Sequence, residues 1–280
     1  MGKLKVLALA AATVIMTLPA ANAADLPLMP RMTPVVEDFA SGWYLRGDVG
    51  VGVQQFQSFD HTATNTGFVW PASWNIDSKS VNSTVFLGAG IGYQVTSWLR
   101  FDVTGEYRVS ARFKAVGRYT EFCSGGGVCF DTYDGNHSSS VFLANAYLDL
   151  GTWWRITPFI GAGVGMAAHS IHDFWDLGLN SDGGTGRGFA ANNTAWNMAW
   201  AVHAGFAFDV SHNLKVELAY RYLNMGDVKT AVIDCLGCGA GGPLAYYTMK
   251  RFDSHDFKLG LRWMLDAPAP VQPYPLVRKG

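Results

Sequence analysis

Long apolar runs are scarce in this sequence, and their scarcity limits how the chain can meet a membrane. Only the stretch from Val6 to Leu18 is continuously apolar, and it is shorter than the about 20 residues that a membrane-spanning helix needs. No later segment approaches that length. If the mature chain enters a membrane, it must therefore do so as strands that satisfy their own backbone hydrogen bonds.

Charge is scarce too, because charged residues make up only 15% of the chain and the formal net charge is -1. Removing Lys3 and Lys5 with an export signal takes the basic count from 21 to 19 against 22 acidic residues, a net charge of about -3. That balance argues against a nucleic-acid partner. What the chain has instead is 14% aromatic residues and 32 glycines, a composition that favours strands and turns over a soluble α/β enzyme.

The first 23 residues have the pattern of an export signal. Two lysines precede the apolar run, and Ala21 and Ala23 form a small-x-small cleavage site. We therefore expect a signal peptide at 1–23, export through the Sec pathway, a periplasmic segment at 24–41, a barrel at 42–265 and a proline-rich periplasmic tail at 266–280. The tail is expected to be extended, either as a spacer or as a docking segment.

Alternation of apolar and polar residues recurs through the mature sequence and predicts strands. It is clearest over 99–113, where Leu99, Phe101 and Phe113 fall on an apolar face opposite a row of charged residues. With seven similar segments, it predicts an all-β fold, an eight-stranded antiparallel transmembrane up-and-down barrel. The other segments are about 43–54, 84–95, 139–150, 156–168, 195–210, 214–222 and 255–265.

The connections between these segments alternate between short turns and long stretches. Short turns on the periplasmic side and four long extracellular loops are typical of outer-membrane barrels. The long loops are predicted, without secondary structure of their own, at about 55–83, 114–138, 169–194 and 225–252, where Gly, Asn, Ser and Asp are frequent.

The phase of the alternation separates a membrane barrel from a soluble lipocalin-like barrel, because the two bury opposite faces. Turning the charged face of segment 99–113 toward lipid would cost about 2 to 4 kcal/mol for each arginine near the midplane. We therefore expect the apolar faces outside and the charges inside, with tyrosines and tryptophans near the strand ends as interfacial girdles.

The predicted interior holds eight cations and seven anions. An eight-stranded barrel is just wide enough for side chains to fill, so these charges are expected to pair as a polar core. The alternative is a narrow charge-lined pathway for ions or water. The residues are Arg46, Asp48, Arg100, Asp102, Glu106, Arg108, Arg112, Asp149, Asp209, Lys215, Glu217, Arg221, Asp256, Lys258 and Arg262.

Four cysteines occur as two close pairs, Cys123 with Cys129 and Cys235 with Cys238. Export places them in an oxidising compartment, so disulfides within the loops are expected, either within each pair or across loops. The second pair also has the spacing of half a zinc site, but there is no second CxxC.

Few residues have the spacing that a metal site or a catalytic site requires. His169 and His172, with Asp173 and Asp176 nearby, have a metal-like spacing, but a solvated polar loop explains them better. No GxSxG motif is present, and Ser170 beside these histidines is the one cluster that resembles a hydrolase site. We expect no enzyme, cofactor or metal site.

Four short motifs occur in order along the chain: ADLP at 24–27, GWYLRGDVG at 42–50, FIGAGVG at 159–165 and YRYLNMGD at 220–227. Together they resemble the small outer-membrane β-barrel proteins of alphaproteobacteria, described as porin-like or opacity-protein-like. The resemblance covers essentially the whole precursor and implies insertion by the barrel-assembly machinery, surface-exposed loops and no catalytic residues. The chain departs from the family in continuing beyond Leu265 instead of ending on an aromatic residue.

The sequence thus favours a structural or porin-like role in the cell envelope, in contact with outer-membrane lipid and lipopolysaccharide. The alternative is adhesion or recognition of a host or cell-surface ligand through loop aromatics, and a lipid-modifying hydrolase is a third, less favoured interpretation. The aromatics are Phe68, Trp70, Trp74, Tyr119, Phe122, Phe174, Trp175, Tyr246 and Tyr247.

Overall fold

The computed structural model describes residues 42–64, 71–121, 123, 126–179, 183–236 and 245–265. The predicted signal peptide, periplasmic segment and tail lie outside these residues. Every regular element in the described part of the chain is a β-strand, and no helix there is long and apolar enough to span a membrane.

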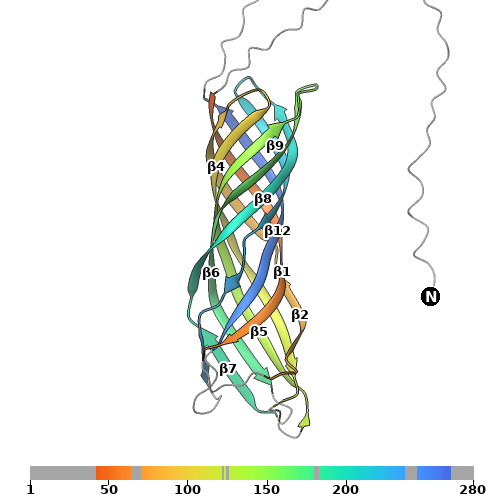
Figure 1. Cartoon of the computed structure of the whole chain (residues 1–280), viewed down its shortest axis with the longest axis vertical. Coiled ribbons are helices and arrows are strands. Elements are labelled where there is room, and N and C mark those ends of the chain that lie inside the picture. The colour runs from red at the N-terminus through yellow and green to blue at the C-terminus, as the bar shows by residue number, and fades with distance from the viewer. Residues whose placement is uncertain are drawn as a thin grey trace, which may run out of the picture. The chain divides into compact units, whose positions relative to one another are not determined.

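Eight long strands close into an antiparallel ring, as Figure 1 shows. Around the ring the order is β6, β5, β4, β3, β1, β12, β9 and β8, and β8 pairs back onto β6. The predicted eight-stranded up-and-down barrel is therefore confirmed. The strands are β1 (Gly42–Ala63), β3 (Thr84–Gln94), β4 (Leu99–Tyr119), β5 (Cys129–Asp149), β6 (Ile156–Leu179), β8 (Asn193–Asp209), β9 (Leu214–Asn224) and β12 (Ala245–Met264).

The four long connections contain much more strand than the sequence predicts. β1, β4 and β6 continue far beyond their predicted ends, and β5 and β12 begin well before their predicted starts. Four short strands lie in the same connections: β2 (Asn75–Val81), β7 (Thr185–Ala190), β10 (Val228–Lys229) and β11 (Ile233–Leu236). The expectation of structureless loops was wrong because polar, glycine-containing segments still pair when a neighbouring strand offers its edge.

A belt of exposed apolar side chains surrounds the half of the barrel nearest the short turns. On β1 it includes Trp43, Leu45 and Val49, each between 44% and 51% exposed. The neighbouring strands contribute residues such as Leu87 and Leu259. This band is the lipid-facing surface that the phase of the sequence predicts. Tyr44, expected in an interfacial girdle, instead lies in the lumen with no exposure.

Above the belt, a β-bulge in β4 reverses which face of the strand points inward. The pairing with β5 passes from Arg108 opposite Ser139 to Ala111 opposite His137, so β4 carries one extra residue there. Arg108 is therefore buried, and after the bulge Phe113 is buried too. The sequence-based assignment of Phe113 to the lipid face was wrong because one inserted residue changes the phase of everything beyond it.

A similar extra residue occurs in β6, and an unusual backbone angle occurs in β12. β6 carries an extra residue opposite Asp134–Asn136, where Asp173 has φ of 54°, and in β12 Arg251 has φ of 49°. The result is an apolar cluster inside the extracellular half, which we name the apolar plug. It comprises Phe56, Phe59, Phe113, Ala115, Tyr133, Val141, Leu143, Ala167, Ile171, Phe174, Ala199, Ala201, Leu223, Met225, Val228, Ile233, Tyr247, Met249 and Phe252.

Candidate functional site: the barrel interior

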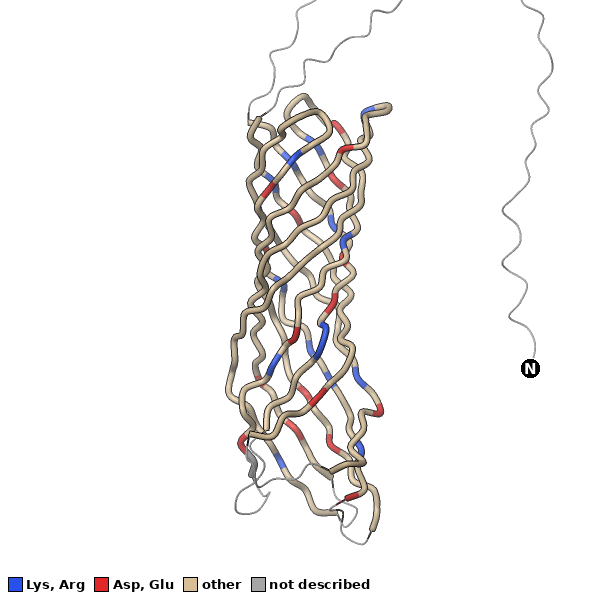
Figure 2. Tube along the Cα trace, viewed as in Figure 1, with Lys and Arg blue, Asp and Glu red and all other residues tan. Residues whose placement is uncertain are grey.

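Inside the belt the lumen is filled with charge. The inward positions of the alternating strands place six cations and six anions there, all buried, so the cluster is formally neutral. Figure 2 shows that Lys and Arg positions are interspersed with Asp and Glu positions along the barrel. The twelve residues are Arg46, Asp48, Arg100, Asp102, Glu106, Arg108, Asp149, Glu217, Arg221, Asp256, Lys258 and Arg262.

The four cations and four anions nearest the short turns form one network, centred on Arg46. Its guanidinium lies 2.8 Å from Asp48 and 2.7 Å from Asp102. Asp102 also accepts hydrogen bonds from Tyr44 at 3.1 Å and from Asn145 at 2.8 Å. A carboxylate with three donors is fully compensated for its removal from water, which is what a buried charge requires.

The remaining members of this network form further ion pairs. Arg100 lies 3.1 Å from Asp149, and Arg262 lies 3.1 Å from Glu217. Lys258 completes the set at 3.4 Å from Asp48.

A second, smaller network lies closer to the apolar plug. Arg221 lies 2.7 Å from Glu106 and 2.6 Å from Asp256, and Arg108 lies 3.1 Å and 2.8 Å from the same two carboxylates. Two cations therefore share two anions in an alternating square. Removing any one of the four leaves an uncompensated buried charge.

Aromatic rings fill the space between the charged groups. The Arg100 guanidinium lies 4.1 Å from the ring centre of Tyr147, and Arg108 lies 4.8 Å from that of Phe86. Glycines on the opposing strands make room for such large groups. A β-carbon on Gly52 would meet the Arg108 guanidinium and would lie 2.5 Å from an Asp256 oxygen and 2.7 Å from the Ser254 hydroxyl, so any larger residue would displace these charged side chains.

Three of the fifteen predicted interior charges lie outside the two buried networks. Arg112 follows the bulge and points outward, where its half-exposed side chain pairs with Asp134 at 2.7 Å, so its assignment to the interior was wrong. Lys215 and Asp209 are at inward positions, as predicted, but they lie at the end of the lumen next to the short turn between β8 and β9. They pair with each other at 2.6 Å, and both are partly exposed. Without these three, the cations and anions of the lumen balance.

The apolar plug closes the next level of the lumen with stacked rings. The ring centre of Phe59 lies 5.0 Å from that of Tyr133 and 5.1 Å from that of Tyr247. The ring centres of Phe113 and Phe174 are 6.0 Å apart. Phe174 and Tyr247, expected as exposed loop aromatics, are therefore interior residues. Trp74, Tyr119, Trp175 and Tyr246 are partly exposed, and Phe68, Trp70 and Phe122 lie outside the described residues.

A histidine pair, which the sequence did not suggest, lies between the charges and the plug. The rings of His137 and His169 approach to 2.9 Å between Nε2 and Nδ1, and His169 Nε2 contacts the carbonyl of Met225 at 2.9 Å. His172 faces away, toward Ser110. The suggested metal pair is therefore divided between two faces of β6, and the described residues contain no group of three metal-binding side chains.

Ser170 also points away from His169, because neighbours on a strand face opposite sides. Its hydroxyl lies 2.9 Å from that of Thr194. The structure therefore does not bring the suggested serine and histidine together.

Two carboxylates lie near the extracellular mouth, on adjacent strands. Asp131 accepts a hydrogen bond from Tyr133 at 3.2 Å, and Asp176 accepts one from Tyr247 at 3.4 Å. Burial, with the nearby Asp176 charge, raises the pKa of Asp131 to about 6, against the opposing effect of the Tyr133 hydroxyl. Burial also raises the pKa of Asp176.

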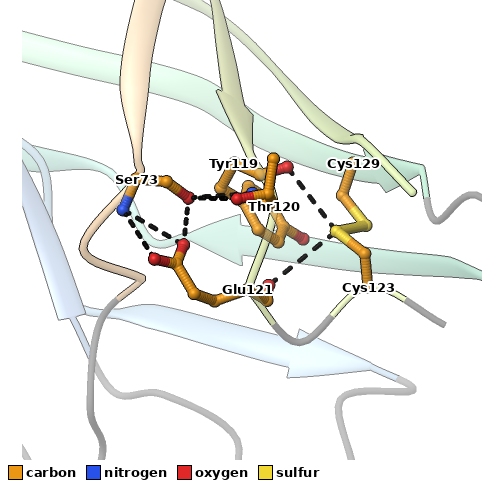
Figure 3. Close-up of a disulfide and its surroundings, with 6 residues drawn as sticks. All are labelled: Ser73, Tyr119, Thr120, Glu121, Cys123 and Cys129. Atoms are coloured by element: carbon orange, nitrogen blue, oxygen red, sulfur yellow. Dashed lines mark hydrogen bonds between the residues drawn. A yellow bond between two sulfur atoms is a disulfide. The ribbon is translucent and has the colours of Figure 1, made fainter. Parts of the chain in front are cut away.

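The disulfide between Cys123 and Cys129 is present in the connection from β4 to β5 (Figure 3). Next to it, both carboxylate oxygens of Glu121 lie 3.1 Å from the backbone nitrogen of Ser73, which belongs to the preceding long connection. The bonding state of Cys235 and Cys238 lies outside what the structure describes.

Comparison with known families identifies the architecture. Residues 8–264 match the family model described as the outer membrane protein beta-barrel domain. The chain belongs to this family. Its location is therefore the outer membrane, and the apolar belt is the surface that contacts lipid.

Several relatives cover nearly the full length. An uncharacterized protein of Brucella abortus (strain 2308) is 30% identical over 272 residues, covering 87% of this chain and 92% of that protein. A Rickettsia prowazekii (strain Madrid E) protein named "Putative adhesin" is 26% identical over 244 residues, covering 86% and 95%. The solved outer membrane protein OprG from Pseudomonas aeruginosa aligns with a TM-score of 0.48 at 15% identity, covering 80% and 97%.

Proposed function

We propose that this protein is a structural component of the outer membrane whose lumen is closed to solutes. The supporting observation is the composition of the interior, with twelve paired charges at the level of the belt and the apolar plug beyond them. A pathway for ions would need water between these side chains. Four of the five lumen arginines, Arg100, Arg108, Arg221 and Arg262, have at most 1% exposure, which favours the closed interior over the charge-lined pathway.

We include export across the inner membrane and insertion into the outer membrane in the same proposal. The apolar run after Lys3 and Lys5 supports export through the Sec pathway, and the alternating strands suit insertion by the barrel-assembly machinery. Lipid and lipopolysaccharide would then cover the belt. This role requires no catalytic residue, cofactor or metal.

Single-channel current from the refolded mature chain in a planar lipid bilayer tests the closed lumen. We expect no discrete current steps from protein whose insertion is verified by protease protection of the belt strands. Reproducible steps from the native chain would overturn the proposal and favour the porin-like pathway. A variant with alanine at Arg46 and Glu217 in the charge network and at Phe59 and Tyr247 in the plug should conduct, whereas either pair alone should not.

Recognition at the cell surface is a second candidate, supported by a different observation. The sheet does not end at the belt but continues as paired strands up to Ala63, Tyr119 and Leu179. At about 3.3 Å per residue, the ten residues of β4 from Ser110 onward extend about 20 to 30 Å beyond the lipid surface, depending on tilt. The name of the Rickettsia relative is consistent with such a projecting surface serving adhesion.

Binding of whole cells tests this second candidate. Bacteria that display the native chain should bind host cells better than bacteria that display a barrel with the four long connections shortened to tight turns. Equal binding by the two strains would contradict recognition and leave the structural role unaffected.

A further inference from the structure

Above the belt the wall of the barrel is split between β1 and β2. β2 continues the line of β3 along β4 in one register, since Val81 lies opposite Phe113 and Phe86 opposite Arg108. On the other side of this line β1 pairs with β3, but only as far as Gly52 opposite Thr84. In the described residues no strand pairing joins β1 to β2. We call residues 57–60 of β1 together with β2 the seam.

A lysine side chain bridges the seam where a backbone pair is expected. Continuing the register of β1 with β3 would place Gln57 opposite Lys79. Instead of a backbone N–H, the Lys79 ammonium group donates a hydrogen bond to the Gln57 carbonyl, and it lies 5.5 Å from the ring centre of Phe56. The flexible stem of lysine thus spans a gap that paired strands, about 4.8 Å apart, would have closed.

The seam also contains a cleft of about 310 Å³. Its apolar lining consists of Phe59, Trp74 and Ile76. Asp60 and Asp77 lie on its two sides. Asp60 pairs with the exposed Lys250 at 3.5 Å, and Asp77 pairs with the exposed Arg118 at 3.3 Å.

We propose that the seam is a docking site for an extended polypeptide strand of a partner protein, with apolar residues alternating with basic ones. Strand edges are templates for backbone pairing with another chain, and the cleft supplies a place for side chains on one face of the incoming strand. Asp60 and Asp77 outnumber Lys79 among the charged residues that line the cleft, and their pairs with Lys250 and Arg118 are exposed and therefore weak, so the borders favour basic side chains. The Lys79 ammonium group donates to the Gln57 carbonyl until a backbone N–H of the peptide replaces it as the donor. This inference rests on the second candidate function, recognition, and names its partner class.

The test uses the full mature chain in lipid nanodiscs and a capped peptide of about eight residues that alternates valine and lysine. Hydrogen exchange measured by mass spectrometry should show slower exchange at 57–60 and 75–81 when the peptide is present. The control peptide has the same side chains but N-methyl groups on alternate residues, so it keeps its charge and loses backbone donors. It should give no protection.

Two variants extend the test. Lys79→Ala removes the competing donor and should tighten peptide binding about fivefold, the equivalent of one hydrogen bond. Ser58→Cys with Ser78→Cys, joined by a short thiol-reactive linker, should abolish protection, and the same variant without the linker should retain it. Folding of each variant is verified by its unchanged heat-dependent gel mobility.

Three outcomes would overturn the inference: equal protection by the N-methylated peptide, protection only away from the seam, or no protection by either peptide. Equal protection would indicate simple attraction of a cation to the carboxylates. Failure of the recognition role is detected separately, because it would leave cell binding unaffected by shortened connections while the peptide still protected the seam.

Discussion

Arg108 on β4 and Asp256 on β12 form a two-pronged ion pair inside the barrel, with nitrogen-to-oxygen distances of 2.8 and 3.0 Å. Neither side chain is exposed to solvent, and the two are 148 residues apart in sequence. The pair therefore ties together strands on different sides of the ring, at a level where water cannot replace either partner.

Replacing this carboxylate should destabilise the barrel strongly. Asp256→Asn leaves Arg108 and Arg221 with Glu106 as their one carboxylate, and breaking a buried ion pair costs about 3 to 5 kcal/mol. Urea unfolding in lipid vesicles measures the loss. The control Asp60→Asn affects an exposed pair with Lys250 and should cost less than about 1 kcal/mol. Similar losses for both variants would contradict the interior network.

A second prediction concerns the space between opposing strands. Gly52→Ala places a β-carbon against Asp256 and Ser254, so we expect a loss of about 1 to 3 kcal/mol, as for overpacking. Gly47→Ala is the matched control on the same strand, because a β-carbon there meets nothing within 4 Å. The difference between the urea midpoints of the two variants measures the effect. A stability for Gly52→Ala equal to that of the control would mean that the lumen is less tightly filled than the structure indicates.

The bulge in β4 offers a third prediction. Deleting Ser110 removes the extra residue, so Arg112 and Lys114 would turn into the apolar plug and Phe113 outward. Burying unpaired cations costs several kcal/mol, and we expect the deletion variant not to fold. Ser110→Ala keeps the bulge and should fold normally. The folded fraction after refolding into lipid vesicles distinguishes them, and efficient folding of the deletion variant would show that the bulge does not set the phase.

The contrast between Val103 and Phe113 explains why the sequence predicted the belt and not the plug. Around Val103 lipid surrounds the barrel, so strict alternation is enforced and can be read from the residues alone. Beyond Arg108 the outside is aqueous, and the favoured pattern reverses. The change of phase occurs within Val109 and Ser110, an ordinary pair that contains no glycine or proline to indicate a bulge.

Contacts that depend on register were equally unpredictable. His137 and His169 meet because β5 and β6 pair with Ser139 opposite His169, and the alternation of each strand alone does not determine that offset. By contrast, the twelve inward charges in the belt needed only the phase of each strand, which is why the sequence proposed all of them. It also proposed Lys215 and Asp209, which lie at the end of the lumen, and Arg112, which lies outside.

Reducing the disulfide should loosen the extracellular connections without unfolding the barrel. The double variant Cys123→Ser with Cys129→Ser opens the disulfide loop, whose ends are 6 residues apart in sequence. The loss of loop-closure entropy lowers the free energy of unfolding by about 2 kcal/mol. The backbone nitrogen of Thr120 donates to the Ser73 hydroxyl at 2.9 Å, so its hydrogen exchange reports on this region. We expect exchange about thirtyfold faster and a free energy of unfolding in urea lowered by about 2 kcal/mol, with the barrel still folded. Unchanged exchange would indicate that the Glu121 contacts hold the region alone.

The carboxylates at the mouth predict that acid stabilises this end of the barrel. Because the pKa of Asp131 is raised to about 6 in the folded state, the folded chain binds a proton more tightly than the unfolded chain does. Stability should therefore rise as pH falls from about 7 toward 4, the value near which the unfolded group titrates. The negative charge of Asp176 opposes ionisation of Asp131. The other titratable groups that face the pair are Tyr119, Tyr133 and Tyr247.

Asp131→Asn isolates this contribution from the carboxylates elsewhere in the barrel. The variant should be more stable than the native chain at pH 7, on the order of 2 kcal/mol, and the difference should vanish near pH 4. Urea midpoints at a series of pH values measure it, with Asp234→Asn as an exposed control. A native chain that is the more stable of the two at pH 7 would mean that Asp131 is held as a favourable charge, and the pair at the mouth would not then be a source of repulsion.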